Sequence, residues 1–493
     1  MKKKPQLDPT APLLYDDHEK PKTRRDFLSA GLISGVGLTI APGLLSMLSS
    51  KAYGQTQCSG GGSATSSVPF LCFDMSGGAN IAGSNVLVGK QGGQLDFLST
   101  AGYSKLGLPS DMTPDKAGQI DTSLGIAFHS DSAILRGIKD KASTATMNGM
   151  NGTIICARSA NDTGNNPHNP MYGIAKAGGE GSIVNLIGTS SSTSGGRSAS
   201  PATMINPEFT PTKVDRPSDA RGLVDTGVLS ELLSPADANK VLKAMENISA
   251  NKVGKMNEQQ MIKEMVNCGY IQASQLAAAA TPDDLDPLQD PNVTSIFSAG
   301  EINSGDTRYR KTASVMKLVI DGRAGAGTIE VGGYDYHDST RATGEIRDFR
   351  MGQQIGGAME YAQKTGNPLM VYVFSDGSVA SDGVLDNSTN GRGKGIWKGD
   401  NSSTASVLIL VYKPGNSGRP TVLSGKQQIG FFSAAGAVDV TANAIANNVN
   451  SLAHAIVLNF MALHGTQGQF ASLFPDHGLG NNLDQYIAFD QLI

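Results

Sequence analysis

Short, nearly continuous apolar runs alternate with amphipathic segments through the second half of the chain, and this alternation limits the possible folds most strongly. The runs that predict buried strands are GTIEVGG (327–333), PLMVYVFSD (368–376) and TASVLILVY (404–412). The segments with helical spacing are 310–320, 352–366 and 440–465. Strands that are apolar on both faces and joined through helices are typical of a mostly parallel sheet with helices on both sides. The sequence therefore predicts an α/β fold.

The first half carries fewer such elements and more turn-forming residues. Strands are predicted over VPFLCFDMSGG (68–78), where Asp74 and a glycine turn close the strand, and over GTIICARSA (152–160). A helix is predicted over 132–143. The Ser-rich segment 188–203 is of low complexity and predicts a long surface loop.

Two further segments set the expected domain boundaries. Residues 55–67 are a Gly/Ser-rich linker, so the folded domain is expected over 68–493. Residues from about 220 to 300 predict a helical insert, in which Ser234-Pro235-Ala236-Asp237 has the form of a helix start with proline in the first turn.

The first 54 residues resemble a twin-arginine export signal. Arg24 and Arg25 precede an uncharged stretch, 27–50, that several glycines and one proline make less hydrophobic. Cleavage is expected after Ala52 or Gly54. The uncharged length would also permit a membrane-spanning helix, but the Gly and Pro content favours a signal that is removed. The expected partner during export is the twin-arginine translocase, and the expected location is the periplasm or the exterior.

Charge and cysteine content narrow the function classes. Residues 1–54 carry eight of the 40 basic and five of the 44 acidic residues, which leaves 32 basic and 39 acidic residues and a net charge of −7. A mildly acidic chain without a basic cluster argues against nucleic acid as a partner. The four cysteines, Cys58, Cys72, Cys156 and Cys268, are too widely spaced for a compact zinc motif, and their pairing stays open.

Polar residues at the ends of the predicted strands are the candidate site, because ligands of α/β sheets bind beyond the carboxyl ends of the strands. The candidate metal ligands are Asp74, Asp335, His337, Asp376, Asp400 and Asn401. Asp335 and His337 are two residues apart, so in an extended segment they face the same side. Oxygen ligands with one imidazole suit a divalent cation such as calcium, magnesium, manganese or zinc. Each residue, taken alone, could instead cap a turn or a helix.

Three residues are candidates for other roles at such a site. His168 lies in an Asn- and Pro-rich loop after the strand predicted at 152–160 and could overhang the same edge. Ser76 and Ser84, beside the first glycine turn, are the nearest hydroxyl nucleophiles.

Several motifs together resemble a bacterial twin-arginine-exported family of unknown function within the alkaline phosphatase and sulfatase superfamily. The matching stretches are SGGANIAGSN (76–85), GGYDYH (332–337), FSDGS (374–378), KGDNSS (398–403) and FASLFPDHG (470–478). The resemblance covers roughly residues 67–493 and implies an alkaline phosphatase-like domain. It implies that Asp335, His337 and Asp400 are metal ligands, with Asp74 and Asp376 as further ones.

The chain also departs from that family's pattern. Asn401 stands where the family has histidine, and Ala79-Asn80 replace an acidic residue of the first turn. A two-zinc phosphatase site needs several histidines, so at most one metal is expected, and Asp400-Asn401 would suit the calcium site of a sulfatase. The C/S-x-P-x-R context of the sulfatase nucleophile is missing.

The sequence thus predicts an exported hydrolase of phosphate or sulfate esters with one divalent metal, in which Ser76 and His168 are the candidate catalytic residues. The alternative is a catalytically degenerate member that binds or assembles an envelope component. A purely structural surface protein is a third reading.

Overall fold

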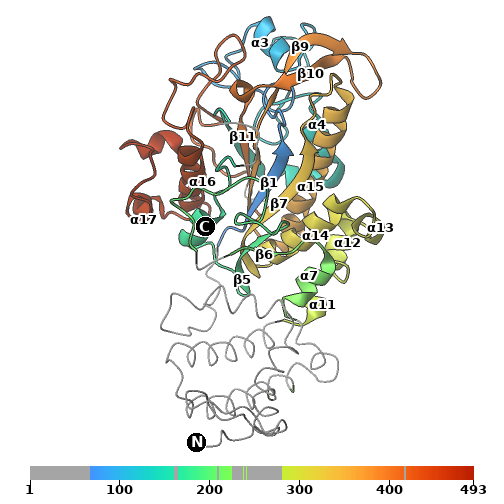
Figure 1. The fold of residues 1–493 in the computed structure, drawn as a ribbon, viewed down its shortest axis with the longest axis vertical. Helices are drawn as coiled ribbons and strands as arrows, with labels where there is room; N and C mark the ends of the chain where they lie inside the picture. Colours follow the sequence, from blue (N-terminus) through green and yellow to red (C-terminus); the bar gives the residue numbers. More distant parts are fainter. Residues whose placement is uncertain are drawn as a thin grey trace, which may run out of the picture.

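The computed structural model describes residues 67–493 except 160–164, 208–209, 416–417 and the stretch 225–279, of which only Asp237 and Lys240 are described (Figure 1). The predicted export signal, most of the linker 55–67 and nearly all of the predicted helix start at 234–237 therefore lie outside the described residues. So do Cys58 and Cys268. Most of the predicted helical insert is outside as well.

An eight-stranded mixed sheet forms the centre of the molecule, in the order β12-β4-β11-β8-β1-β7-β5-β6. Its strands are β1 Phe70–Gly77, β4 Met150–Ile155, β5 Val184–Gly188, β6 Thr212–Lys213, β7 Ala324–Tyr334, β8 Leu369–Ser375, β11 Val407–Tyr412 and β12 Gln428–Ile429. β1 pairs in parallel with β7 and with β8, whereas β11 runs antiparallel to both β8 and β4. The predicted α/β fold with a mostly parallel sheet is confirmed.

Helices cover both faces of this sheet, and two separate apolar cores lie between the layers (Figure 1). On one face are α4 Ala133–Lys141, α14 Thr307–Ile320 and α15 Ala342–Thr365; on the other are α6 Met171–Lys176, α16 Val449–Leu463 and α17 Phe470–Leu473. β1 is fully buried and supplies both cores, because Leu71 and Phe73 point to the first face and Phe70 and Cys72 to the second. This burial on two faces explains the uninterrupted apolar runs in the sequence.

Shorter elements surround the sheet. An antiparallel ribbon, β9 Val379–Asp386 with β10 Lys394–Asp400, stands beyond the carboxyl ends of β1, β7 and β8. The remaining elements are α3 Thr100–Lys105, β2 Ile120–Asp121, β3 Phe128–His129, α5 Thr144–Asn148, α7 Pro217–Gly222, α11 Pro282–Leu285, α12 Pro291–Ile296, α13 Ala299–Ile302 and the 3₁₀ turns η1 Ser402–Thr404, η2 Gln467–Gln469 and η3 Leu483–Tyr486. Among the described residues, no helix is both long and apolar enough to cross a membrane.

Polar caps set the limits of the longer helices. The side chain of Ser132 accepts a hydrogen bond from the amide of Leu135 at the start of α4, and Asp306 accepts from Arg308 at the start of α14. α15 ends at Thr365 and is capped by Gly366, whose positive φ of 71° suits glycine. The predicted strands and helices of the second half are present, but α16 is shorter than the predicted 440–465. Asn448 caps it by accepting from the amide of Ser451, so residues 440–448 form turns instead.

Three predictions about the site region need correction. β1 does not end at Asp74 but continues to Gly77, which places Asp74 inside the sheet opposite Phe374 and Glu330. The Ser-rich segment 188–203 is a loop, yet Ser194 and Ser198 in it are buried, so it is not a simple surface loop. The β9–β10 ribbon was not predicted, and Asp400 is the last residue of β10 rather than the lead into β11.

Candidate metal centre

Three of the predicted ligands come together in space. Asp335 follows the last residue of β7, His337 lies two residues further, and Asp400 ends β10. One ligand atom from each of the three lies within 4.8 Å of the others. The Nδ1 atom of His337 is 2.7 Å from Oδ1 of Asp335 and 3.2 Å from Oδ1 of Asp400. We call this group the Asp-His-Asp triad.

Side chains after β7 point alternately inward and outward, so Asp335 and His337 of the triad face the solvent. Tyr336, between Asp335 and His337, points inward and is fully buried. Its hydroxyl donates a hydrogen bond to Oδ1 of Asp348 on α15 (3.0 Å) and accepts one from the amide of Asn80 (3.1 Å). Because Tyr336 is anchored from two sides, its neighbours are held on the solvent side.

The glycine turn at the end of β1, Gly77–Gly78, packs closely against the backbone and side chains of the triad. Gly77 has a φ of +137°, and a Cβ atom there would lie 2.2 Å from the backbone nitrogen of Asp335. The amide of Gly78 donates to the carbonyl of Tyr334 at 3.1 Å. A Cβ on Gly78 would lie 3.7 Å from Oδ1 of Asp400. Only glycine at position 77 allows the backbone to approach so closely.

The donor set and its exposure suit a divalent cation. The triad offers two carboxylates and one imidazole, the ligand types that such cations take in proteins. Among the described residues, Nδ1 of His337 has no partner in hydrogen-bond geometry, although two carboxylates lie beside it. The side chains of Asp335, Asp400 and His337 are 61%, 46% and 37% exposed, so solvent reaches all three. A protonated His337 would instead form an ion pair with the two carboxylates.

Asp74 is not part of this triad but lies buried in the sheet beneath the Ser-rich loop. Its Oδ2 accepts hydrogen bonds from the amides of Arg197 (2.9 Å) and Ser198 (2.8 Å). A Cβ on Gly196 would lie 2.8 Å from the same oxygen. Burial raises the pKa of Asp74 to about 7, although the amide of Ser198 acts in the opposite direction.

Asp376 forms the second half of this buried acidic pair. Its Oδ1 accepts from the amide of Gly77 at 2.6 Å, and its Oδ2 accepts from Nε of Arg197 at 3.1 Å. Burial raises its pKa to about 6, against the lowering effect of Gly77 and Arg197. The Gly77–Gly78 turn therefore contacts Asp376 on one side and the triad on the other.

The other predicted site residues have structural partners or are buried. The side-chain oxygen of Asn401 accepts from the amide and hydroxyl of Ser403 and caps η1. The Oγ of Ser84 accepts from Arg341 at 2.8 Å. Ser76 is buried, and its hydroxyl has no hydrogen-bond partner among the described residues.

His168 lies against the sheet rather than over its edge. Its ring stacks on Phe374 with the centroids 5.6 Å apart, and it is 2% exposed. Burial lowers its pKa to about 3, so the ring is neutral at pH 7. Cys72 and Cys156 are both buried free thiols.

Sequence reasoning missed the groups that hold the buried acidic pair. Arg197 and Ser198 come from a segment interpreted only as low-complexity sequence, and the contact with Asp74 joins residues more than 120 positions apart. The one available signal was SGGRS (194–198), where a glycine pair precedes an arginine within a serine run.

Comparison with known proteins gave no match: no protein-family model, no curated protein and no solved structure is significantly similar to this chain.

Proposed function

We propose that this chain is an exported α/β hydrolase that cleaves phosphate or sulfate esters with one divalent cation held by Asp335, His337 and Asp400. The convergence of these three ligand atoms within 4.8 Å at the carboxyl edge of the sheet carries the proposal. The motif resemblance to the alkaline phosphatase and sulfatase superfamily supplies the reaction class. The resemblance of the first 54 residues to a twin-arginine signal supplies the location, in the periplasm or outside the cell.

The three side chains of the triad would hold the cation and would leave its other coordination positions free for the ester and water. A cation bound there would polarise the ester oxygens and stabilise the charge of the transferring group. Water is the nucleophile in this proposal: it adds to phosphorus or sulfur, the ester bond to the alcohol oxygen breaks, and the leaving alcohol takes up a proton. A protein hydroxyl is not required, which agrees with the burial of Ser76.

A second candidate function is binding without catalysis, for example of an envelope component. The observations that favour it are the burial of Ser76 and His168 and the use of the Asn401 oxygen as a helix cap. In this case the triad would be a structural cation site or an ion pair, and no ester would be cleaved.

Metal content tests the ligand assignment directly. We expect about one equivalent of a divalent metal in mature protein purified without chelators, and its loss in Asp335→Ala, because one of the three ligands is removed. Elemental analysis measures this, with Asp111→Ala as the control because Asp111 is exposed and outside the triad. Equal metal content in both variants would show that the triad is not the site.

Ester cleavage then separates the two candidate functions. Chromogenic phosphate and sulfate esters are offered to the metal-loaded protein and to Asp335→Ala. Turnover that disappears in Asp335→Ala supports the hydrolase. Bound metal without turnover of either ester class supports the binding protein.

A further inference from the structure

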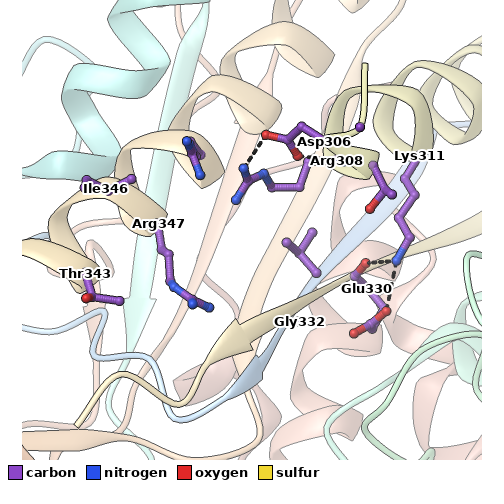
Figure 2. A pocket seen from close by; sticks show the side chains of 12 residues that line it. Asp306, Arg308, Lys311, Glu330, Gly332, Thr343, Ile346 and Arg347 are labelled. Carbon is purple, nitrogen blue, oxygen red and sulfur yellow. Dashed lines mark hydrogen bonds and ion pairs between the residues drawn. The ribbon is translucent and has the colours of Figure 1, made fainter. Parts of the chain in front are cut away.

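A cleft of about 660 Å³ lies beside the carboxyl end of β7 (Figure 2). Its lining comes from α14, from the end of β7 and from the first turns of α15. The lining residues are Gly305, Asp306, Thr307, Arg308, Lys311, Glu330, Val331, Gly332, Thr343, Ile346, Arg347 and Arg350. The volume lies within the range of sites for small molecules.

Cationic side chains outnumber acidic ones in this cleft. The four cations are Arg308, Lys311, Arg347 and Arg350, against two carboxylates. Asp306 pairs with Arg308, and Glu330 pairs with Lys311 at 3.0 Å, as the dashed lines in Figure 2 show. Within the part of the chain that the structure describes, Arg347 and Arg350 have no carboxylate within ion-pair distance. The lining therefore carries two positive charges in excess of its negative charges, on a protein that is acidic as a whole.

The fold adds to this positive potential. α14 precedes β7 and α15 follows it, so both helices begin at the carboxyl end of β7. Their first turns, which include Thr307 and Thr343, line the cleft. The N-terminus of an α-helix carries partial positive charge and favours anions. The partial positive charges of the helix N-termini add to the potential of the arginines, which provide the main charge.

The guanidinium of Arg347 lies close to the backbone at the end of β7. A Cβ atom on Gly333, whose φ is +91°, would lie 1.7 Å from Nη1 of Arg347. The carbonyl of Arg347 accepts a hydrogen bond from the hydroxyl of Tyr334 at 3.0 Å. The backbone of Arg347 is thus bonded to the residue that ends β7, and its guanidinium lies close to that strand end. Figure 2 shows it on one side of the cleft, with Lys311 and Glu330 on the other.

We propose that this cleft binds a small polyanion that carries phosphate or sulfate groups, with Arg347 and Arg350 as its main contacts. The planar guanidinium matches the paired oxygens of a tetrahedral oxyanion. The binding site is separate from the Asp-His-Asp triad and needs no metal, so the inference does not depend on the proposed hydrolase activity.

Calorimetric titration of pyrophosphate into the mature protein at low ionic strength, with a chelator present, tests this. We expect saturable binding that weakens about tenfold or more in Arg347→Ala and in Arg350→Ala, because each change removes charge-assisted hydrogen bonds. Lys364→Ala removes one positive charge from the far end of α15 and is the matched control, with expected wild-type affinity. Arg347→Lys keeps the positive charge but loses the planar guanidinium with its paired donors, and should bind pyrophosphate with intermediate affinity.

Several results would overturn the proposal: no binding of pyrophosphate by the wild-type protein, or equal affinity in Arg347→Ala, Arg350→Ala and the control. If succinate binds as tightly as pyrophosphate, the assignment to phosphate or sulfate groups is wrong. Asp335→Ala should keep its pyrophosphate affinity, so failure of the metal assignment and failure of this proposal are seen in different measurements.

Discussion

Asp74 is the residue whose environment differs most from what its sequence position suggests. A carboxylate near the end of a strand is ordinarily solvated, yet Asp74 is fully buried inside β1. Burial without a full cationic partner favours the protonated form. The nearby carboxylate of Asp376 acts in the same direction, and the two backbone amides act against it. The pair binds protons more tightly in the folded protein than in the unfolded chain.

This raised pKa predicts a loss of stability as the pH rises. The pKa of Asp74 is about 7 in the folded state and 3.8 when unperturbed. Between these values the folded state binds more protons than the unfolded state, so the free energy of unfolding falls with increasing pH, by at most about 1.4 kcal/mol per pH unit for one group. The contribution is fully present below about pH 4 and is lost as the pH rises through 7.

Asp74→Asn tests this, because an amide oxygen can accept from the same two backbone amides. We expect the stability of the variant to depend less on pH between 5 and 8 than that of the wild type, as measured by urea unfolding at several pH values. Some slope should remain, since burial also raises the pKa of Asp376 to about 6 and that of Asp348 to about 7. Identical slopes in the two proteins would contradict the assignment.

At the scale of elements, the β9–β10 ribbon and helix α15 depend on each other. Arg341 is the N-cap residue of α15, but its side chain makes no cap hydrogen bond. Oδ2 of Asp386, at the end of β9, accepts from the amides of Arg341 (2.9 Å) and Ala342 (3.2 Å) instead. Lys394 of β10 is buried and donates to Glu345 of α15 at 2.8 Å. The ribbon that carries Asp400 is thereby fixed to the helix that follows His337.

Removal of this cap should destabilise the protein modestly. We expect Asp386→Ala to lower the free energy of unfolding by about 1 kcal/mol at pH 7, the usual cost of a lost helix cap. Hydrogen bonds from Ser388, Arg341 and Ala342 lower the pKa of Asp386 to about 2, so its contribution persists above pH 4 and is lost as the pH falls through 2. Asp382→Ala is the control on the same ribbon, because Asp382 accepts from Val384 and caps no helix. Urea unfolding of both variants measures the difference, and an equal loss would contradict the cap.

Across the whole molecule, the sequence predicted the strands and helices better than the side chains that meet at the edge of the sheet. The runs in β7, β8 and β11 and the helical spacing of α4, α14 and α15 are local patterns, because each element buries its apolar face over consecutive turns or residues. Asp335 and His337 could be paired from the sequence because they share one short extended segment.

The remaining features depend on contacts between distant segments. Asp400 joins the triad only because β10 pairs with β9, and no local apolar pattern marks that ribbon. The burial of Ser198 depends on its contact with Asp74 of β1, since serine composition alone predicts exposure. Arg347 and Arg350 share one helix face, but only the position of α14 turns this face into a cleft.

The two apolar cores should unfold together, because the central sheet belongs to both. β1 supplies Phe73 to the core beneath α14 and α15, and Phe70 to the core beneath α16. Both side chains are fully buried, so replacement of either by alanine removes apolar burial and leaves a cavity, at a cost of about 3–5 kcal/mol. In differential scanning calorimetry we expect Phe70→Ala and Phe73→Ala to lower the midpoint of the same transition, while Leu95→Ala, which is 64% exposed, leaves it nearly unchanged. Two transitions, each sensitive to only one of the phenylalanine variants, would show instead that the faces of the sheet unfold independently.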